Sequence, residues 1–430
     1  MRHHSFLNLG WYVILALSFF PTLFWAIEPS RLHFSDPVTT LASIGQVLAL
    51  VGTSMFALNL ILSARLHFLE KYFGGLNTLY IKHNQLGQWA FILLLFHPLF
   101  LVPKYSTDFS QAASFLFLSS NWARNWGWLA LVLMIVLISL TLYLRPKYNL
   151  WKLTHKFLGL AFFLAALHVF LIPSDVSIYL PLRMYILGLS FLGLLGFTYR
   201  KLLWGILVKK YKYRVTKVIR LAENVVEVRM VPEGPKLEFT PGQFVFVSFS
   251  GPGVDSESHP FSICSDPRSD ELVLCAKKLG DYTSRLDSLS VGSKANLEGA
   301  FGVFSYLNSK YKNQIWIGGG IGITPFLSMA KSLVGTTEYS VDLYYCVRNP
   351  TEAIFLEELK DAAPSLRVIP FFSGTQGYLD SDVVERMSGG LDHKDIFICT
   401  PVGMVRSLKK QLISKKVDKN LIHSEEFDLT

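Results

Sequence analysis

Residues 81 to 100 read IKHNQLGQWAFILLLFHPLF, and residues 154 to 170 read THKFLGLAFFLAALHVF. Each stretch is apolar enough for a membrane helix, yet each contains two histidines. An ionisable side chain at membrane depth is costly, so four of them at two matched heights are expected to be ligands. Imidazole is a common axial ligand of haem iron, and two parallel helices with two such rings each could hold two haems. The expected ligands are His83 and His97 in the first stretch and His155 and His168 in the second.

The composition favours a membrane setting for these histidines. Of all residues 51% are hydrophobic and only 17% are charged, and the apolar residues concentrate in the first half. Six segments there approach the ~20 residues that a helix needs to cross a bilayer. The first has no small-residue cleavage site and is followed by another span, so it is expected to stay as a transmembrane helix. The expected spans are residues 10–27, 41–63, 84–102, 126–144, 156–172 and 178–204.

Lys and Arg in the short loops predict the orientation of these spans. If the six spans alternate in direction, the loops on one side of the membrane contain Arg2, Arg65, Lys71, Lys82, Arg145, Lys147, Lys152, Arg200, Lys201, Lys209, Lys210 and Lys212. The loops on the other side contain Arg31, Lys104, Arg124 and Arg183. The richer side is expected to be cytoplasmic, which places both termini in the cytoplasm. The net charge of +9 is then a topology signal and an attraction to the headgroups of the lipid bilayer, and we expect no nucleic-acid partner.

When consecutive spans alternate in direction, the third and fifth spans run in the same direction, and this predicts which histidines pair. His83 should face His155 near the cytoplasm, and His97 should face His168 near the outer face, with the two levels about 20 Å apart. A spacing of 14 residues returns to nearly the same helix face, whereas 13 residues miss it by roughly 140°. The fifth helix must therefore be rotated, bulged or kinked, or its two rings must approach their haems from different sides. Pro98 could distort the third helix. The alternative is two buried histidines bonded to neighbouring helices and two unrelated ones at the interface.

A soluble part begins near residue 205, where the composition changes. Five short alternating runs predict a small antiparallel β-barrel. From residue 314 the pattern becomes strand then helix, repeated, which predicts a parallel sheet covered by helices. The expected domains are residues 1–205, 206–308 and 309–430, and the barrel strands are expected at 211–219, 224–231, 243–249, 271–278 and 294–298.

The four cysteines all lie in this second half, which the topology places in the reducing cytoplasm. We therefore expect no disulfide, and their spacing matches no zinc site. The residues are Cys264, Cys275, Cys346 and Cys399.

A glycine-rich turn follows the strand-like QIWI and precedes a helix. Glycine lets the backbone approach a pyrophosphate, and a helix N-terminus offers unpaired amides. Thr324, followed by Pro325, could add a hydroxyl to this anion site. A tight turn with no ligand is the alternative. The glycines are Gly318, Gly319, Gly320 and Gly322.

Five motifs follow one another along the second half. They are HPFS at His259, Pro260, Phe261 and Ser262, GDYTSRL at 280–286, GAFG at 299–302, GGGIG at 318–322 and CTPVGM at 399–404. In this order, after a membrane half with paired histidines, they resemble the transmembrane NADPH oxidase and ferric reductase superfamily over essentially the whole chain. The resemblance implies a six-helix transmembrane haem-binding bundle, an antiparallel β-barrel FAD domain and an α/β parallel-sheet NAD(P)H-binding domain.

The resemblance also assigns roles to single residues. HPFS is similar to the flavin signature of the family, in which the backbone and the Ser262 hydroxyl contact the isoalloxazine. Gly280 and Thr283 resemble the turn that holds the FAD pyrophosphate, and Lys277 stands where relatives carry an arginine that pairs with phosphate. GAFG, with Gly299 and Gly302, is similar to a G-P-[YF]-G turn with Ala in place of Pro.

The remaining motifs concern the nicotinamide side. Cys399 resembles a cysteine near the nicotinamide, although Thr400 replaces the glycine of the family pattern. Phe427, in the C-terminal HSEEFDLT, resembles an aromatic residue that stacks over the flavin, and a core aromatic of a last strand is the alternative. Arg348, at the end of a predicted strand, could pair with a cofactor phosphate or remain solvated. NADPH and NADH are both compatible with this pattern.

The resemblance implies an enzyme of the bacterial inner (plasma) membrane that carries electrons from NAD(P)H through FAD and two haem b groups to an outer small molecule. A ferric chelate and O2 are both candidate acceptors, and Leu101 stands where oxygen-reducing relatives place an additional histidine. Phe162 and Phe163 could lie between the haems, although packing or contact with lipid is the favoured interpretation. The alternative function is a six-span transporter or proton channel with a nucleotide-sensing domain. Protein partners are not predicted.

Overall fold

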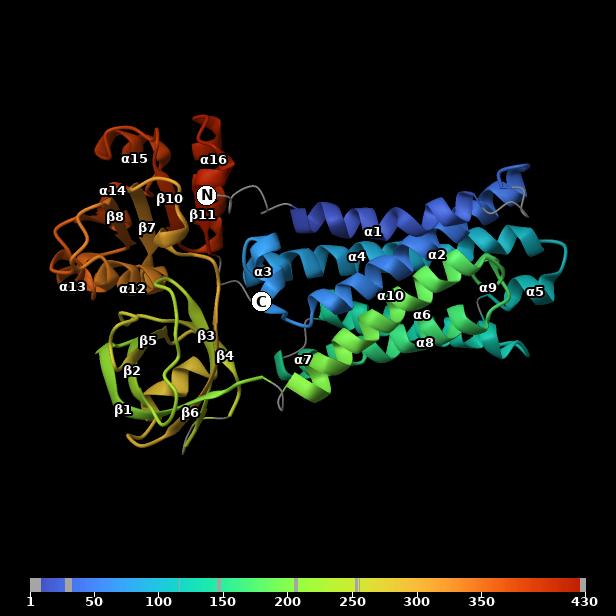
Figure 1. Ribbon diagram of the computed structural model, residues 1–430, viewed down its shortest axis with the longest axis horizontal. Helices are drawn as coiled ribbons and strands as arrows, with labels where there is room; N and C mark the ends of the chain where they lie inside the picture. Colours follow the sequence, from blue (N-terminus) through green and yellow to red (C-terminus); the bar gives the residue numbers. More distant parts are fainter. Residues whose placement is uncertain are drawn as a thin grey trace. The chain divides into compact units, whose positions relative to one another are not determined.

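The computed structural model describes residues 9–27, 33–115, 117–144, 148–204, 208–251, 254 and 256–425. The chain divides into two compact units, a helical one before Val208 and a mixed one from Val208 onward (Figure 1). The helical unit contains α1 (Leu9–Ala26), α2 (Pro37–Leu62), α3 (His67–Phe73), α4 (Leu76–Leu101), α5 (Phe109–Ala113), α6 (Trp122–Ser139), α7 (Tyr148–Lys156), α8 (Leu158–Leu171), α9 (Asp175–Ile178) and α10 (Leu180–Thr198).

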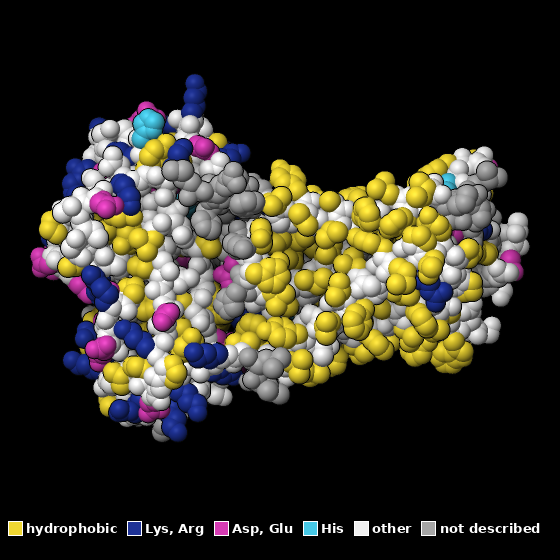
Figure 2. Space-filling view, viewed as in Figure 1, with side chains coloured by type: hydrophobic (Ala, Val, Ile, Leu, Met, Phe, Trp, Pro, Cys, Tyr) yellow, Lys and Arg dark blue, Asp and Glu magenta, His cyan; other side chains and the backbone are white. Residues whose placement is uncertain are grey.

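Among the described residues, six helical spans are long and apolar enough to cross a membrane. Each coincides with one of the expected spans, because hydropathy over some 20 residues is a local property of the chain. Figure 2 shows apolar side chains over most of the visible surface of this unit, as expected for helices that face lipid. The spans are Leu9–Ala26, Pro37–Leu62, Thr78–Tyr105, Trp122–Ser139, Leu150–Leu171 and Leu180–Leu203.

The central helix of this unit is α2. Its most apolar window is 67% buried, whereas the windows of the other five spans are 11% to 28% buried. Asp36 caps its first turn by accepting from the backbone N–H groups of Val38 and Thr39. Small residues then allow close packing: a Cβ on Gly52 would lie 2.8 Å from the Leu94 side chain of α4. The helix that carries two of the predicted ligands is therefore held tightly against the bundle centre.

The first half of the mixed unit is an antiparallel sheet of order β4-β3-β6-β1-β2-β5. The expected antiparallel strands are present, but the expected barrel does not close: among the described residues, the edge strands β4 and β5 meet only through an isolated bridge between Ile263 and Leu274. The strand β4 has four residues and includes Pro260, which has no N–H to donate, so it is too short to complete the closure. The strands are β1 (Tyr211–Ala222), β2 (Val225–Pro232), β3 (Phe244–Ser250), β4 (His259–Ser262), β5 (Leu272–Lys277) and β6 (Lys294–Phe301).

The second half of the mixed unit is a five-stranded sheet of order β11-β10-β7-β8-β9 with parallel pairing throughout, which confirms the α/β prediction. The strands are β7 (Asn313–Gly319), β8 (Ser340–Val347), β9 (Leu366–Phe372), β10 (Asp395–Cys399) and β11 (Ile422–Ser424). The helices are α12 (Thr324–Ser332), α13 (Leu356–Lys360), α14 (Ser373–Gln376), α15 (Ser381–Met387) and α16 (Val402–Ser414).

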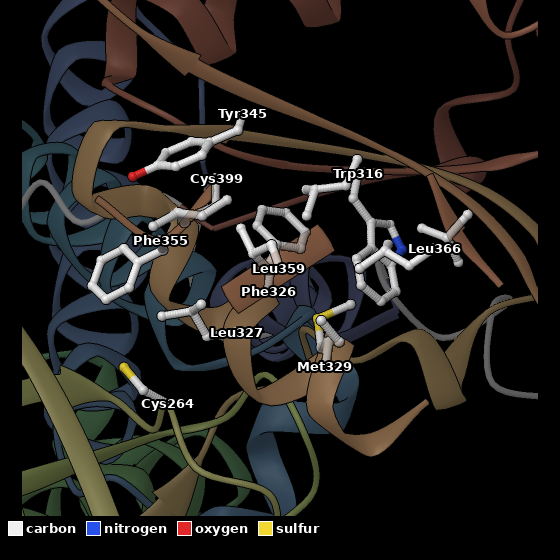
Figure 3. Packing of buried hydrophobic residues seen from close by; sticks show 14 of the residues in the cluster. Cys264, Trp316, Phe326, Leu327, Met329, Tyr345, Phe355, Leu359, Leu366 and Cys399 are labelled. Carbon is white, nitrogen blue, oxygen red and sulfur yellow. The ribbon is translucent and has the colours of Figure 1, made fainter. Parts of the chain in front are cut away.

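Both faces of the parallel sheet are covered, because alternate side chains of β7 enter different cores. Ile315 and Ile317 join the core under α16, whereas Trp316 enters the core under α12. Trp316 stacks on Phe326 of α12 with ring centroids 5.6 Å apart, and Figure 3 shows both rings in this core. The same core includes Cys264 and Cys275 of the antiparallel sheet, so the two halves of the mixed unit share buried surface.

Candidate functional site

Three of the four predicted ligand histidines donate a hydrogen bond to a backbone carbonyl of another helix. The Nδ1 atom lies 3.1 Å from Asn59 O for His83, 2.8 Å from Gly45 O for His97 and 2.7 Å from Ala123 O for His168. A carbonyl oxygen only accepts, so each Nδ1 carries the proton and each Nε2 keeps a free lone pair. Those Nε2 atoms have no hydrogen-bond partner among the described residues. Metal-bound histidines are usually oriented in this way.

The inner pair has the separation that one shared metal requires. The ring centroids of His83 and His155 are 6.2 Å apart, with an angle of 63° between the ring planes. Two metal–nitrogen bonds of about 2 Å each, added to the distance from each nitrogen to its ring centre, span roughly 6 Å. The spacing of His83 and His155 would therefore allow both side chains to hold one iron. His155 differs from the other three because its buried Nδ1 has no partner among the described residues, and its ring stacks on Trp151 at 5.2 Å.

The outer pair lines a cavity of about 290 Å³ inside the helical unit. That volume is near the lower end of the ~300–1,000 Å³ typical of small-molecule sites. His168 lies against α6, where a Cβ on Gly127 would be 2.9 Å from the imidazole, so the glycine makes room for the ring. The wall is mostly apolar, and its cations are Lys104 and Arg124. Arg124 is held over the Phe115 ring, 4.6 Å from the centroid.

The fifth span is broken between its two histidines. A turn at Phe157 separates α7, which carries His155, from α8, which carries His168. The Phe157 N–H bonds to Thr154 O, three residues back, rather than four. The angular count of an unbroken helix therefore does not apply across Phe157. By contrast, α4 continues from His83 through Pro98.

The phenylalanines between these histidines are packing residues. Phe162 is fully buried and its ring lies 4.9 Å from that of Phe56 on α2. Phe163 is 49% exposed on the outside of the unit, where lipid would be. Within the described residues, no cluster of three or more His, Cys, Asp or Glu could hold a bare metal ion. The histidines form two pairs, as two six-coordinate haems would need.

HPFS forms the edge strand β4, paired with β3. Phe261 and Ser262 are buried, and His259 stacks on Tyr282 with ring centroids 3.9 Å apart. Tyr282 belongs to the GDYTSRL turn, so this stack joins two of the predicted flavin motifs. Sequence reasoning missed it, although the position of Tyr282 between Gly280 and Thr283 was a usable signal.

The GDYTSRL turn is built around the Thr283 hydroxyl, which accepts from the N–H groups of Leu279 and Gly280 at 3.0 and 3.1 Å. This arrangement starts a short 3-10 helix, Thr283–Ser288. Gly280 has open space around it, so a phosphate could approach its backbone. Lys277 ends β5 close to this turn, and its neighbour Lys278 forms an ion pair with Asp287.

The GAFG turn contains two glycines with positive φ, 142° at Gly299 and 99° at Gly302. L-amino acids with side chains rarely adopt these angles. The Gly302 carbonyl accepts from Gln243 Nε2 at 2.9 Å, which ties the turn to β3. This predicted flavin motif is therefore a fixed turn at the end of β6.

The GGGIG turn packs against β10. A Cβ on Gly322 would lie 2.2 Å from Cys399 O, and one on Gly319 would lie 2.9 Å from Thr400. Gly320 has φ of 56° and open space around it. The close packing places the start of α12 at the carboxyl ends of the strands, where α/β sheets bind ligands.

The other residues predicted to bind a cofactor near the GGGIG turn differ in their environments. Thr324 donates its hydroxyl to Ile321 O at 2.9 Å, so it supports the turn, and Pro325 occupies the first turn of α12. Gly318 also lines the turn, because a Cβ there would lie 2.7 Å from Ile323. Arg348 is exposed directly after β8, where its side chain is available for a phosphate.

Cys399 ends β10 and is fully buried. Burial raises the pKa of this thiol well above its usual value, so it remains a neutral thiol at physiological pH. Glu425, which sequence reasoning missed, is also buried, and burial raises the pKa of its carboxyl to about 8. A Cβ on Gly302 would lie 3.6 Å from Glu425 Oε1. Glu425 directly follows β11 and therefore links the GAFG turn to the Cys399 strand, and no local pattern in HSEEFDLT marks it as buried. Phe427 lies outside the described residues.

Three protein families match the chain in order. Residues 48–166 match the ferric reductase like transmembrane component, residues 210–323 match an FAD-binding domain, and residues 316–410 match an oxidoreductase NAD-binding domain. The first match includes His83, His97 and His155, and the other two include all five motifs of the mixed unit.

Individual curated relatives match about half of the chain. The reductase component of propane 2-monooxygenase from Rhodococcus jostii (strain RHA1) is 26% identical over 255 residues, or 54% of this chain and 68% of the relative. Dual oxidase 2 from Sus scrofa is 31% identical over 224 residues, or 48% of this chain and 14% of that protein. The flavohemoglobin from Malassezia yamatoensis with bound FAD and heme is similar in fold, with a TM-score of 0.51, 16% identity and coverage of 91% of this chain and 98% of that one.

Proposed function

Because the chain matches, in order, the ferric reductase like transmembrane component, an FAD-binding domain and an oxidoreductase NAD-binding domain, we propose that it carries electrons from cytoplasmic NAD(P)H to a small acceptor on the outer face. The observation that carries this proposal is the set of oriented imidazoles in the helical unit. Three Nδ1–H groups are committed to backbone carbonyls, and the Nε2 lone pairs are left for iron. A proton relay would have no need for this orientation.

The residues fit two b-type haems. His83 and His155 would hold the inner one and His97 and His168 the outer one. When bound, FAD accepts a two-electron hydride and haem iron accepts one electron at a time, which lets the chain join NAD(P)H to one-electron acceptors. The Lys104 and Arg124 cations line the outer cavity, where they would balance carboxylate charge. Apolar walls around the outer rings exclude water.

The mixed unit supplies the hydride-transfer end. The HPFS strand and the GDYTSRL turn would orient the flavin, and the GGGIG turn at the start of α12 would bind a pyrophosphate. Cys399 would lie beside the nicotinamide as a small neutral side chain. Glu425, with its pKa near 8, would hold a proton on its carboxyl at neutral pH beside the same junction.

Spectroscopy of the purified full-length protein tests this proposal. After reconstitution with haemin and FAD, we expect two haems and one FAD per chain, and reduction of both haems by NAD(P)H. A protein without haem or flavin absorption would overturn electron transfer and leave the transporter or channel as the explanation of the buried histidines. NADPH and NADH compared side by side would identify the donor.

The outer acceptor is either a ferric chelate or O2. Leu101 lines the outer cavity, and an apolar residue there favours outer-sphere transfer to a chelate. The two acceptors are distinguished by measuring ferric citrate reduction under anaerobic conditions and superoxide-dismutase-sensitive dye reduction in air, in both cases with reconstituted protein and NAD(P)H.

A further inference from the structure

A buried Asp395 and a partly buried His423 form a hydrogen-bonded pair at the edge of the parallel sheet. Asp395 is fully buried at the start of β10, and its Oδ1 lies 2.7 Å from His423 Nε2. Its Oδ2 accepts the backbone N–H groups of Lys310 and Tyr311 at 2.9 and 2.6 Å. A carboxylate with three such donors is well satisfied, and the histidine must donate its Nε2–H.

His423 is attached to the sheet in a second way. Its ring stacks on Phe397 of β10 with centroids 4.4 Å apart and an angle of 22° between the planes. The histidine is the middle residue of β11, a three-residue edge strand that pairs only with β10 in the described structure. So short an edge strand has few ladder hydrogen bonds, and its side chains must contribute to holding it.

Strand β11 positions Glu425, the residue that directly follows it. Its N–H bonds to Ile398 O at 3.1 Å, which continues the β11 pairing by one step. This bond places the Glu425 carboxyl between Gly302 of the GAFG turn and Cys399 of β10. The carboxyl thus reaches the predicted meeting point of flavin and nicotinamide because β11 stays in register.

We infer that the Asp395–His423 pair is a positioning device that holds Glu425 at the junction between the flavin and nicotinamide sites. His423 acts through Glu425, the residue that follows β11. The inference rests on the NAD(P)H-to-FAD step of the proposed function and is independent of the haems and of the outer acceptor.

The position of Glu425 predicts a pH effect. Its carboxyl is neutral below about pH 8 and negative above it, because burial raises its pKa. A negative charge beside the reduced flavin, which is itself anionic, opposes reduction, so the rate constant of FAD reduction should fall as the pH rises through about 8. The titratable group that faces Glu425 from β10 is the Cys399 thiol, which stays neutral in this range, and the residue of the GAFG turn next to the carboxyl is Gly302, which has no titratable side chain.

The test compares two substitutions of His423 in the full-length protein. His423→Phe keeps the stacking ring and removes the hydrogen bond, whereas His423→Gln keeps a donor. With stopped-flow mixing of NAD(P)H, His423→Phe should slow FAD reduction by up to about 100-fold, the cost typical of a misplacement of about 1 Å. Its pH profile should shift to lower pH, because a released Glu425 is better solvated. His423→Gln should remain within about threefold of the wild type.

Two further measurements separate positioning from loss of structure. Hydrogen exchange in the protein without added nucleotide should be faster in the peptide containing residues 422–425 for His423→Phe alone. FAD content and melting temperature should be close to wild type, and His393→Asn, at an exposed histidine of the same domain, should change none of these properties.

Each result of these experiments either supports the inference about His423 or overturns it. A wild-type rate and pH profile in His423→Phe would overturn the inference, as would a loss of rate that only follows loss of FAD. In a Glu425→Gln background, His423→Phe should add no further slowing, and an additive effect would also overturn it. Absence of haem would defeat the proposed transmembrane pathway while leaving this result unchanged.

Discussion

The inner and outer histidine pairs have the same composition and differ in how their rings are held. Both outer rings donate Nδ1–H to a backbone carbonyl, at 2.8 Å for His97 and 2.7 Å for His168. At the inner level only His83 does so, and the buried Nδ1 of His155 has no partner among the described residues. A bonded Nδ1 sets both the tautomer and the orientation of the ring. The outer site is therefore organised in advance, whereas the inner site contains one adjustable ring.

The backbone that carries His155 is also less constrained than the backbone that carries the other histidines. His83 and His97 lie on one continuous helix, whereas His155 lies at the end of α7, two residues before the turn at Phe157. A ring at a helix end can change direction at less cost than one inside a packed helix. The lesson is that equal ligands at two levels of one bundle can have different rigidity, and substitutions can measure that difference.

The largest expected effect comes from removing an outer ligand. His168→Ala should lower bound haem from two to one per chain, because an anchored ligand is lost and His97 is the only other histidine among the described residues that line the cavity. The pyridine haemochrome assay measures the loss. His155→Ala is the matched inner variant, and it should also lose one haem. If either variant kept both haems, the pairing would be wrong.

A smaller effect should follow Gly127→Ala. The added Cβ would lie 2.9 Å from the His168 ring, so the imidazole must move from its bond to Ala123. We expect weakened binding or a shifted spectrum of the outer haem, with the inner haem unchanged. Gly188→Ala in α10 is the matched control, since nothing lies within 4 Å of its added Cβ. Because Ala favours helix over Gly by about 1 kcal/mol, poorer haem binding would be due to the contact rather than to helix propensity.

The smallest effect is expected at the inner level. Trp151→Leu removes the ring that stacks on His155. A stack of this kind contributes about 0.5–1.5 kcal/mol, so the inner haem should stay bound while its low-spin signal in electron paramagnetic resonance broadens. The outer signal should not change. A sharper inner signal in Trp151→Leu, or broadening of the outer one, would contradict the proposed difference in rigidity.

Much of the fold could be predicted because it depends on local patterns. The six spans lie within a few residues of their expected bounds. Five of the six strands of the antiparallel sheet were also expected at nearly their observed positions. The sixth, β4, was not read as a strand because HPFS is short and contains Pro260, and the open edge that it leaves is why the barrel prediction failed.

The candidate site residues also divide into those that could be predicted from sequence and those that could not. The motif residues of the mixed unit could be named from sequence, since each motif is a short turn with a recognisable glycine or hydroxyl. The stack of His259 on Tyr282 and the burial of Glu425 could not, because each depends on residues that are distant along the chain.

The sequence by itself determined which histidines stand in apolar helices, and at what spacing, because residue identity and hydropathy are properties of the chain alone. Only the tertiary structure decided which nitrogen of each ring is free and where the fifth span breaks. The carbonyl that orients His168 belongs to Ala123, 45 residues away. Contacts of that kind exist only after the helices have packed, and they distinguish the rigid outer pair from the adjustable inner one.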